Sequence, residues 1–420
     1  MTQPQTNWAR NVTFQAARVH RPRSIGELQE IVAGSDRLRA LGTGHSFSTV
    51  ADTTGDLVSV VDLPRAVSVD AERATVTTGA GGSYGELAGF LHAAGWALPN
   101  LGSLPQISVA GACATGTHGS GRRLGCLATS VSGVQLVRPD GELLTFRRGH
   151  ADFAGAVVAL GSLGVVTALT LDVVPTFDVR QVVYLGLPHA TVSERFDEVL
   201  DSAYSVSVFT DWRGDTARVF RKNRVGVDDV ADGDFAPDWL GATAATVPSH
   251  PVPGAETAGA TEQLGVPGPW HERLAHFRVN FTPSSGDELQ SEYLVAREHG
   301  AAAFDAVHAI GAQVAPALQI CEIRTVAADD LWLSMASGRD SVALHFTWFD
   351  DVAAATSAIV ALERALEPFA PRPHWGKLFA MAPEVVRARY ERLPDFQRLR
   401  GQLDPRNKLG NEFVDRYLGD

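Results

Sequence analysis

Two glycine-rich stretches constrain what this chain can fold into and bind more than any other feature. The first is Leu38–Phe47 (LRALGTGHSF), where a short apolar segment runs into Gly42 and Gly44, and His45 follows at once. Glycine lets the backbone turn at positive φ and lets a planar ligand approach closely, and consecutive turn amides can hold pyrophosphate oxygens. The stretch lacks the third glycine of a Rossmann fingerprint and the Gly-Lys-Ser/Thr of a Walker A loop. Taken alone, a tight turn with a surface histidine explains it equally well.

The second stretch comprises Ser103–Gly111 (SLPQISVAG) and Thr115–Gly121 (TGTHGSG), within the glycine-dense segment Gly79–Gly125. Backbone amides together with Ser and Thr hydroxyls can wrap a diphosphate and a planar ring without bulk. A glycine-rich surface loop is the simpler interpretation, but it explains the recurring hydroxyls poorly. The two stretches together therefore indicate a dinucleotide site.

Size and composition exclude several classes of protein. The chain has 420 residues, is 45% apolar and carries a net charge of −12, without a Lys/Arg run that could bind nucleic acid. The three cysteines, Cys113, Cys126 and Cys321, form neither a disulfide framework nor a zinc-ligand spacing, so we expect no metal and a reducing compartment. Residues 1–19 lack a signal-peptide pattern, and no apolar run is long enough to span a membrane. We expect a cytoplasmic monomer that binds neither nucleic acid nor membrane.

Predicted strands and helices alternate over the N-terminal part of the chain. Capping boxes open helices at Ser24 and Ser83, a hairpin turn lies at Pro139–Gly141, and a helical pattern covers Phe153–Leu160. The segment Asp228–Pro269 is rich in Pro, Gly and Ala, which predicts a long ordered loop around a substrate lobe. Further strands are expected at Leu289–Ala296, Gln319–Val326 and Ser341–Phe349, and further helices at Arg297–Gln313 and Val352–Phe369.

Two of these predicted strands each present two polar side chains to one face. Side chains alternate along a strand, so Glu322 and Arg324 share a face, and so do His345 and Thr347, with apolar side chains opposite. Buried polar groups must be paired, so these faces indicate a polar cavity, with a solvated sheet face as the alternative. Lys377, in the sequence HWGK, is either a surface amine or a cation that stabilises charge on a cofactor or substrate oxygen.

The chain resembles the vanillyl-alcohol-oxidase type of FAD-dependent oxidase, and within it the alditol-oxidising members. The resemblance covers almost the whole length and rests on five segments in the family's order: Gly42–Phe47, Ser103–Gly111, Thr115–Gly121, Cys321–Arg324 and His374–Lys377. It implies an α+β fold with a two-subdomain FAD-binding domain of the vanillyl-alcohol-oxidase (PCMH) type and an α+β cap domain with an antiparallel sheet. The FAD-binding domain would span residues 1–178, the substrate-binding cap residues 179–377, and residues 378–420 would return to the FAD-binding domain.

The resemblance also implies how FAD is held. His45 would carry the covalent bond, through a ring nitrogen to the flavin 8α-methyl carbon. Relatives that attach the flavin twice have a cysteine shortly before the second glycine-rich stretch; Leu98–Ser103 has none, so a single histidyl link is expected. The other implied FAD contacts are Leu41, Gly42, Thr43, Gly44, Ser46, Phe47, Ser103, Ser108, Gly111, Thr115, Gly116, Thr117, His118, Val165, Val166 and His374.

The implied reaction oxidises the terminal C1 hydroxyl of an alditol, such as xylitol or sorbitol, to the aldose. A hydride passes to flavin N5, and O2 is reduced to hydrogen peroxide. Lys377, Arg324 and Glu322 would be catalytic: Arg324 and Lys377 polarise the C1 oxygen, Lys377 accepts its proton, and Glu322 fixes the C2 hydroxyl. The implied substrate site is completed by Ser103, His345 and Thr347.

Three other interpretations of the sequence stay open. Aldonolactone oxidases or dehydrogenases share the His-Trp-Gly-Lys element and act on a cyclic sugar lactone. A protein of the same fold could use an electron acceptor other than O2. A non-catalytic flavin- or sugar-binding protein is the most remote alternative, because the polar faces at Glu322 and His345 are intact.

Overall fold

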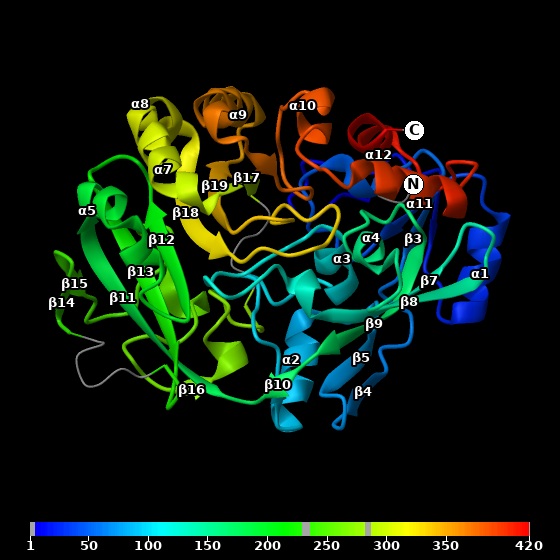
Figure 1. Ribbon diagram of the computed structural model, residues 1–420, viewed down its shortest axis with the longest axis horizontal. Helices are drawn as coiled ribbons and strands as arrows, with labels where there is room; N and C mark the ends of the chain where they lie inside the picture. Colours follow the sequence, from blue (N-terminus) through cyan, green and yellow to red (C-terminus); the bar gives the residue numbers. More distant parts are fainter. Residues whose placement is uncertain (1–4, 229–235, 282–286, 420) are drawn as a thin grey trace.

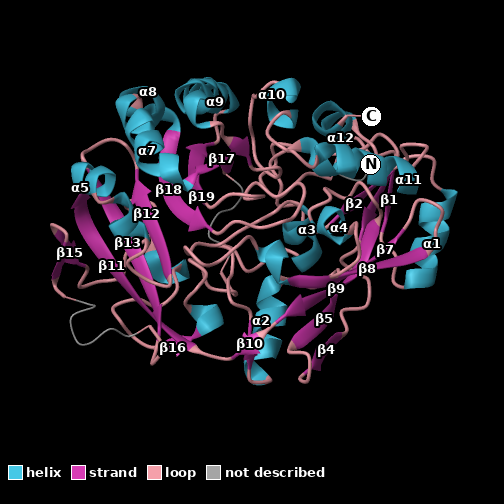
Figure 2. Ribbon diagram, viewed as in Figure 1, coloured by secondary structure: helices cyan, strands magenta, loops and turns pink. Residues whose placement is uncertain are grey.

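The computed structural model describes residues 5–228, 236–281 and 287–419. Two regions of sheet lie side by side, and short helices surround them (Figures 1 and 2). The expected α+β fold is confirmed. Within the described residues, no helix has the length and apolar character that a membrane crossing requires.

The N-terminal region contains two main sheets and one short strand pair. In the three-stranded sheet, parallel strands follow the order β1-β3-β2. In the five-stranded sheet, antiparallel strands follow the order β4-β5-β9-β7-β8, and the β7–β8 hairpin confirms the turn predicted at Pro139–Gly141. The bounds are β1 Arg18–His20, β2 Leu38–Leu41, β3 Asp56–Ser59, β4 Val67–Asp70, β5 Thr75–Gly79, β7 Val131–Val137, β8 Leu143–Arg147 and β9 Val165–Asp172, with β6 Trp96–Ala97 paired to β10 Val174–Pro175.

Both predicted capping boxes open helices, but only one is complete. Ser83 and Glu86 bond each other's backbone N–H groups at the start of α2 (Tyr84–Ala93). At α1 (Ile25–Gly34), Ser24 accepts from the Glu27 N–H, whereas the Glu27 carboxylate accepts from the N–H of Arg23. Two short helices follow, α3 (Val109–Ala114) and α4 (Phe153–Val157); α4 ends three residues before the predicted end, where Val158 leaves helical geometry.

A ten-stranded sheet forms the second region, in the order β14-β15-β11-β13-β12-β18-β19-β17-β20, with β16 beside β11. The three predicted strands are confirmed to within one residue as β17, β18 and β19. The sequence did not predict β11 and β13, because β11 is nearly continuously buried without alternation and β13 carries Arg221 and Lys222, which resemble surface residues. The bounds are β11 Asp178–Pro188, β12 Ser205–Thr210, β13 Thr216–Arg224, β14 Asp238–Trp239, β15 Ala242–Ala244, β16 Gly268–Pro269, β17 Glu288–Ala296, β18 Leu318–Val326, β19 Ser341–Phe349 and β20 Arg372–Pro373.

The predicted loop Asp228–Pro269 is therefore not one loop. It contributes β14, β15 and β16 to the edge of this sheet, and its residues 229–235 lie outside the described part. Helices cover one face of the sheet (Figure 2), and the predicted helix at Arg297–Gln313 divides into α7 and α8. The helices of this region are α5 His189–Glu194, α6 Phe196–Leu200, α7 Gly300–Ala309, α8 Gly311–Val314 and α9 Val352–Leu366.

The C-terminal tail returns to the N-terminal region, as the red and blue ribbons in Figure 1 show. Its helices are α10 (Pro383–Arg387), α11 (Leu393–Leu403) and α12 (Glu412–Leu418). The Leu38 N–H donates to the Lys408 carbonyl at 2.8 Å, so the tail hydrogen-bonds strand β2 directly. This contact anchors the strand from which the turn of the first glycine-rich stretch continues.

Candidate active site

A cavity of about 660 Å³ lies between the glycine-rich loops and the ten-stranded sheet. Its size is within the range of small-molecule and cofactor sites, roughly 300–1,000 Å³. Nearly all predicted cofactor and substrate residues line it; the exceptions are Gly116 and Val165. A Cβ on Gly116 would meet Met335, and Val165 is buried in β9, whereas its neighbour Val166 does line the cavity.

The two glycine-rich stretches pack against each other at one end of this cavity. Strand β2 ends at Leu41 and the chain turns, with Gly44 at φ +71°. Gly42 lies so close to the second stretch that an added Cβ would clash with the Ser108 Oγ, and the Ser108 N–H donates to the Thr43 Oγ1 at 3.1 Å. Glycines, amides and hydroxyls therefore form a narrow cradle without bulky side chains.

His45 points from this cradle toward an aromatic neighbour that the sequence analysis missed. Its ring stacks on Trp8 with centroids 5.3 Å apart and planes 21° apart. Its Nδ1 lies 3.0 Å from the Thr43 Oγ1. Burial lowers the pKa of His45 to about 4, and a hydrogen bond with Thr43 raises it by less. The imidazole is therefore neutral at pH 7.

The opposite side of the cavity consists of polar side chains from three adjacent strands. In β18 and β19, Glu322 pairs with His345; in β17 and β19, Glu292 pairs with the same His345. The predicted faces of Glu322/Arg324 and His345/Thr347 thus lie on one side of the sheet, and all four residues line the cavity. The alternative of a solvated sheet face is wrong, because all four are at least 92% buried.

Glu292 is the centre of the polar network, and the sequence analysis did not find it. Its Oε1 lies 2.7 Å from Arg324 Nη2 and 3.2 Å from His118 Nε2, and its Oε2 lies 2.7 Å from Lys377 Nζ. Burial alone would raise the pKa of Glu292, but the charges of Lys377, His118 and Arg324 lower it well below its ordinary value. The alternation rule, applied to the predicted strand Leu289–Ala296, would have placed Gln290 and Glu292 on one face.

Lys377 is held where the flavin-side loop meets the sheet. Its segment is fixed from both sides, since the His374 N–H donates to the Glu292 carbonyl at 2.9 Å and the Phe47 N–H donates to the Gly376 carbonyl at 2.7 Å. Burial, then the charge of Arg324, lowers the pKa of Lys377, while its ion pair with Glu292 opposes the shift. The surface-amine interpretation is wrong, because the side chain is only 14% exposed.

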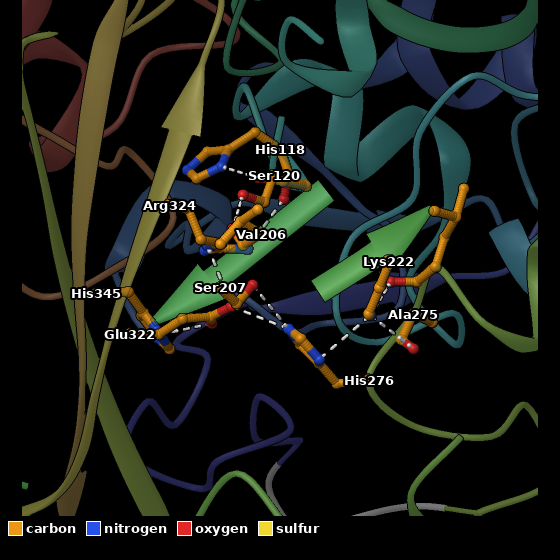
Figure 3. Close-up of polar contacts among 12 residues, drawn as sticks. His118, Ser120, Val206, Ser207, Lys222, Ala275, His276, Glu322, Arg324 and His345 are labelled. Atoms are coloured by element: carbon orange, nitrogen blue, oxygen red, sulfur yellow. Dashed lines mark hydrogen bonds and ion pairs between the residues drawn. The ribbon is translucent and has the colours of Figure 1, made fainter. Parts of the chain in front are cut away.

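Glu322 also lies next to two histidines that line the cavity with it, shown in Figure 3. His276 Nε2 lies 2.9 Å from its Oε1, and His345 Nδ1 lies 3.7 Å from its Oε2. Burial would raise the pKa of Glu322, but Arg324 and His276 lower it well below the ordinary value. His276 follows Ala275 and precedes Phe277 in a segment without strand alternation, so no sequence pattern identified it.

Two polar atoms of the network have no hydrogen-bond partner. Arg324 Nε and His345 Nδ1 are buried and make no hydrogen bond within the described residues, and they lie 3.6 and 3.7 Å from the Glu322 carboxylate oxygens. Burial, with the charge of Lys377, also lowers the pKa of His345 to about 4, so this ring is neutral. Along this face the carboxylates Glu292 and Glu322 balance the cations Arg324 and Lys377, which suits an uncharged, hydroxyl-rich ligand.

One His/Asp cluster lies apart from the cavity. The ligand atoms of His189, Asp215 and His308 lie within 4.8 Å of one another, and of the three only His189 is buried. The His189 ring packs against Trp212, with centroids 5.3 Å apart. None of these residues lines the cavity.

Comparisons with known proteins identify the family to which the chain belongs. A family model described as "FAD binding domain" matches residues 16–147, and one described as "D-arabinono-1,4-lactone oxidase" matches residues 284–417. An alditol oxidase of Streptomyces sp. (strain IKD472 / FERM P-14339) is 50% identical over 418 residues, which is 99% of each chain. The chain belongs to the vanillyl-alcohol-oxidase type of FAD-dependent oxidases.

The chain is also similar to two more distant proteins. L-gulono-1,4-lactone dehydrogenase of Mycobacterium tuberculosis (strain ATCC 25618 / H37Rv) is 28% identical over 99% of each chain. The crystal structure of cholesterol oxidase from B. sterolicum superposes with a TM-score of 0.79 over 99% of this chain and 96% of that one, at 14% identity. The latter likeness concerns the fold alone.

This flavoprotein oxidoreductase therefore uses FAD, as the sequence indicated. The cradle fits the cofactor: Gly42, Gly44 and Gly111 line the cavity without side chains, and residues with hydroxyl groups, Thr43, Ser108 and Thr115, line it beside them. The ring would then lie between His45 and the polar network of the sheet.

Proposed function

We propose that this enzyme oxidises the terminal C1 hydroxyl of alditols such as xylitol and sorbitol to the aldose, with O2 reduced to H2O2. The carrying observation is the buried polar face around Glu322, Arg324 and His345, which balances its own charges and contains polar atoms without a hydrogen-bond partner among the described residues. The 50% identity to an alditol oxidase over the full chain supports the same substrate class.

Two residues of the polar face act on the C1 hydroxyl. Bound FAD supplies the two-electron acceptor for the hydride that leaves C1. Arg324 and Lys377 polarise the C1 oxygen, and the neutral form of Lys377 accepts the hydroxyl proton at Nζ as the C=O bond forms. The hydrogen bond from Lys377 Nζ to Glu292 Oε2, at 2.7 Å, holds Lys377 in place in both protonation states.

The remaining polar residues orient the substrate. Glu322 accepts a hydrogen bond from the C2 hydroxyl, His345 and Thr347 bind the distal hydroxyls, and Ser103 places the carbon chain. Orientation of the C1–H bond is the main catalytic task, because a well-oriented bound pair avoids much of the entropic cost of reaction.

We propose that FAD is attached covalently through His45 alone. The neutral ring is a competent nucleophile, and Trp8 fixes its plane. Gly42, Gly44, Gly111 and the surrounding hydroxyls would hold the diphosphate. Acid precipitation of the purified protein tests the bond: a yellow pellet supports it, whereas a white pellet under a yellow supernatant contradicts it.

We also propose the division into an FAD-binding domain (1–178 and 378–420) and a cap (179–377). The hydrogen bonds between the tail and β2 support the first unit. Three free, buried cysteines support a reducing, cytoplasmic location. A monomer is expected, which light scattering coupled to gel filtration can test.

The decisive experiment compares substrates by peroxide production. Xylitol and sorbitol should give H2O2 at rates well above those with L-gulono-1,4-lactone. The lactone reaction is the second candidate, because a D-arabinono-1,4-lactone oxidase model matches residues 284–417 and a lactone dehydrogenase aligns over 99% of the chain. Faster oxidation of the lactone, or reduction of an artificial acceptor without peroxide, would replace the proposal.

A further inference from the structure

One fully buried cation lies behind the polar face and takes no part in the proposed chemistry. Lys222, on β13, is 1% exposed and does not line the cavity. Its Nζ lies 2.6 Å from the Leu274 carbonyl, 3.4 Å from the Ala275 carbonyl and 3.4 Å from His276 Nδ1. A buried lysine needs this many partners, and all three belong to one segment.

His276 connects this lysine to the substrate face, as Figure 3 shows. Its Nε2 lies 2.9 Å from Glu322 Oε1. Burial, with the charge of Lys222, lowers the pKa of His276 to about 4, so the ring is neutral with one donor and one acceptor nitrogen. An ammonium group only donates, so a charged Lys222 requires Nδ1 to be the acceptor, and the ring hydrogen then points from Nε2 to Glu322.

We propose that Lys222 and His276 are positioning residues for polyol binding: the lysine sets the histidine tautomer, and the histidine orients the Glu322 carboxylate that accepts a substrate hydroxyl. The inference rests on the proposed function, because it takes Glu322 as the hydroxyl acceptor. His276 lines the cavity and Lys222 does not, and the proposal gives neither residue a part in the oxidation at C1.

The arrangement makes polyol affinity depend on pH. The charged or titratable groups that act on Lys222 are Glu322, Arg324 and His276, while its neighbours across the sheet, Gln181 and Ser205, are uncharged. Burial, with help from Arg324 and against Glu322, lowers the pKa of Lys222 to about 7. Above that pH the neutral amine has two hydrogens for three acceptors, and its lone pair can accept from Nδ1–H. The tautomer is then no longer imposed, so xylitol affinity should fall as the pH rises through 7.

Kinetics of Lys222→Met and His276→Phe test the proposal. Both should raise KM for xylitol about tenfold, the size expected when one hydrogen bond to a charged group is weakened, with kcat changed by less than about threefold. The rise of KM around pH 7 should disappear in Lys222→Met. Lys222→Gln keeps neutral donors without the charge, so it should recover part of the affinity at all pH values without restoring the pH dependence.

Lys408→Met is the matched control for loss of a buried lysine. Lys408 donates to three carbonyls, those of Val32, Ala33 and Pro139, and does not line the cavity. Its variant should lose thermal stability but keep the wild-type KM and its dependence on pH. If Lys222→Met behaves in the same way, Lys222 is only a structural tie and the proposal is overturned.

A binding measurement separates this inference from the proposed function. In a Lys377→Ala background, in which turnover is expected to be about 10²–10⁴-fold slower, xylitol is titrated at pH 6 and pH 8 and its affinity is read by calorimetry. Tighter xylitol binding at pH 6 than at pH 8 supports the proposal if the addition of Lys222→Met removes this difference. The same pH dependence in both variants overturns the proposal for Lys222 and His276 and leaves the proposed function standing. Absence of xylitol binding by the single variant overturns the proposed function and the inference together.

Discussion

The two walls of the cavity consist of different chemical groups. The flavin-side wall is backbone and small side chains from two loops, with Gly42 and Ser108 in contact. The substrate-side wall is long charged side chains from neighbouring strands, with Glu292 bonded to both Arg324 and Lys377. The flavin-side wall should be sensitive to changes in backbone conformation and to added volume, because its parts are closely packed. The substrate-side wall should be sensitive to loss of a charged group, because the partner is then left as an unpaired buried ion.

The largest expected effect is on the substrate-side wall, in catalysis. Lys377→Ala should lower kcat with xylitol by about 10²–10⁴-fold, the contribution of a positioned acid–base group. The FAD content should remain that of the wild type, because Lys377 bonds the sheet carboxylate Glu292. Peroxide assays and visible absorbance per protein measure the two quantities. Near wild-type turnover would remove the assigned role.

Charge removal at the centre of the same wall should be the next largest effect, now in stability. Glu292→Gln keeps the shape but leaves Arg324 and Lys377 facing a neutral amide. Breaking a buried ion pair on one side costs about 3–5 kcal/mol in the free energy of unfolding, measurable by urea denaturation. Glu298→Gln, at a side chain 80% exposed, is the control and should change stability by less than about 0.5 kcal/mol. Equal effects at the two positions would contradict the network.

The same contrast explains how much the sequence could predict. The flavin-side wall is local in sequence: glycines and hydroxyls stand next to one another, and both stretches line one cavity. The strands β17, β18 and β19 were also predictable, since their alternation is local. The substrate faces of Glu322 and His345 followed from that alternation alone.

The remainder of the site depends on contacts between distant segments. Glu292 lies beside His345 only through the β17–β19 register, and local patterns do not define strand pairing. Lys222 and His276 were missed for a related reason: a lysine in a charged run resembles a surface residue until a partner segment buries it. Prediction failed where the burial of a polar side chain depended on a partner from a distant segment.

A buried charge also exists in the three-stranded sheet of the N-terminal region, outside both walls of the cavity. Asp56, on β3, is 1% exposed and bonds Arg18 at 2.6 and 2.8 Å. Burial alone would raise the pKa of Asp56, but hydrogen bonds from Arg18, Ser35 and His20 lower it to about 2. Since the folded pKa is depressed, this stabilisation is present above about pH 4 and is lost as the pH falls toward 2.

Asp56→Asn should therefore destabilise the protein by about 2 kcal/mol at pH 7, the equivalent of the pKa shift. Urea midpoints measured from pH 7 to pH 3 should show a smaller decline in the variant than in the wild type. Identical pH slopes would mean that the Asp56 ion pair adds nothing to the stability of the N-terminal region.

The smallest expected effect tests the flavin-side wall through the backbone. Gly44 has φ +71°, where an added Cβ meets no atom closer than 3.8 Å, so Gly44→Ala introduces strain without a clash. A left-handed conformation costs a non-glycine residue roughly 1–2 kcal/mol. Gly95, at φ +82° and with open space around its Cβ position, is a matched control outside the cavity. Both variants should lose about 1 kcal/mol in urea denaturation. Only Gly44→Ala should lower the FAD content of the purified protein, because relief of its strain shifts the turn that carries His45. An equal loss of FAD in Gly95→Ala would show that FAD binding responds to overall stability and not to the backbone of the cradle.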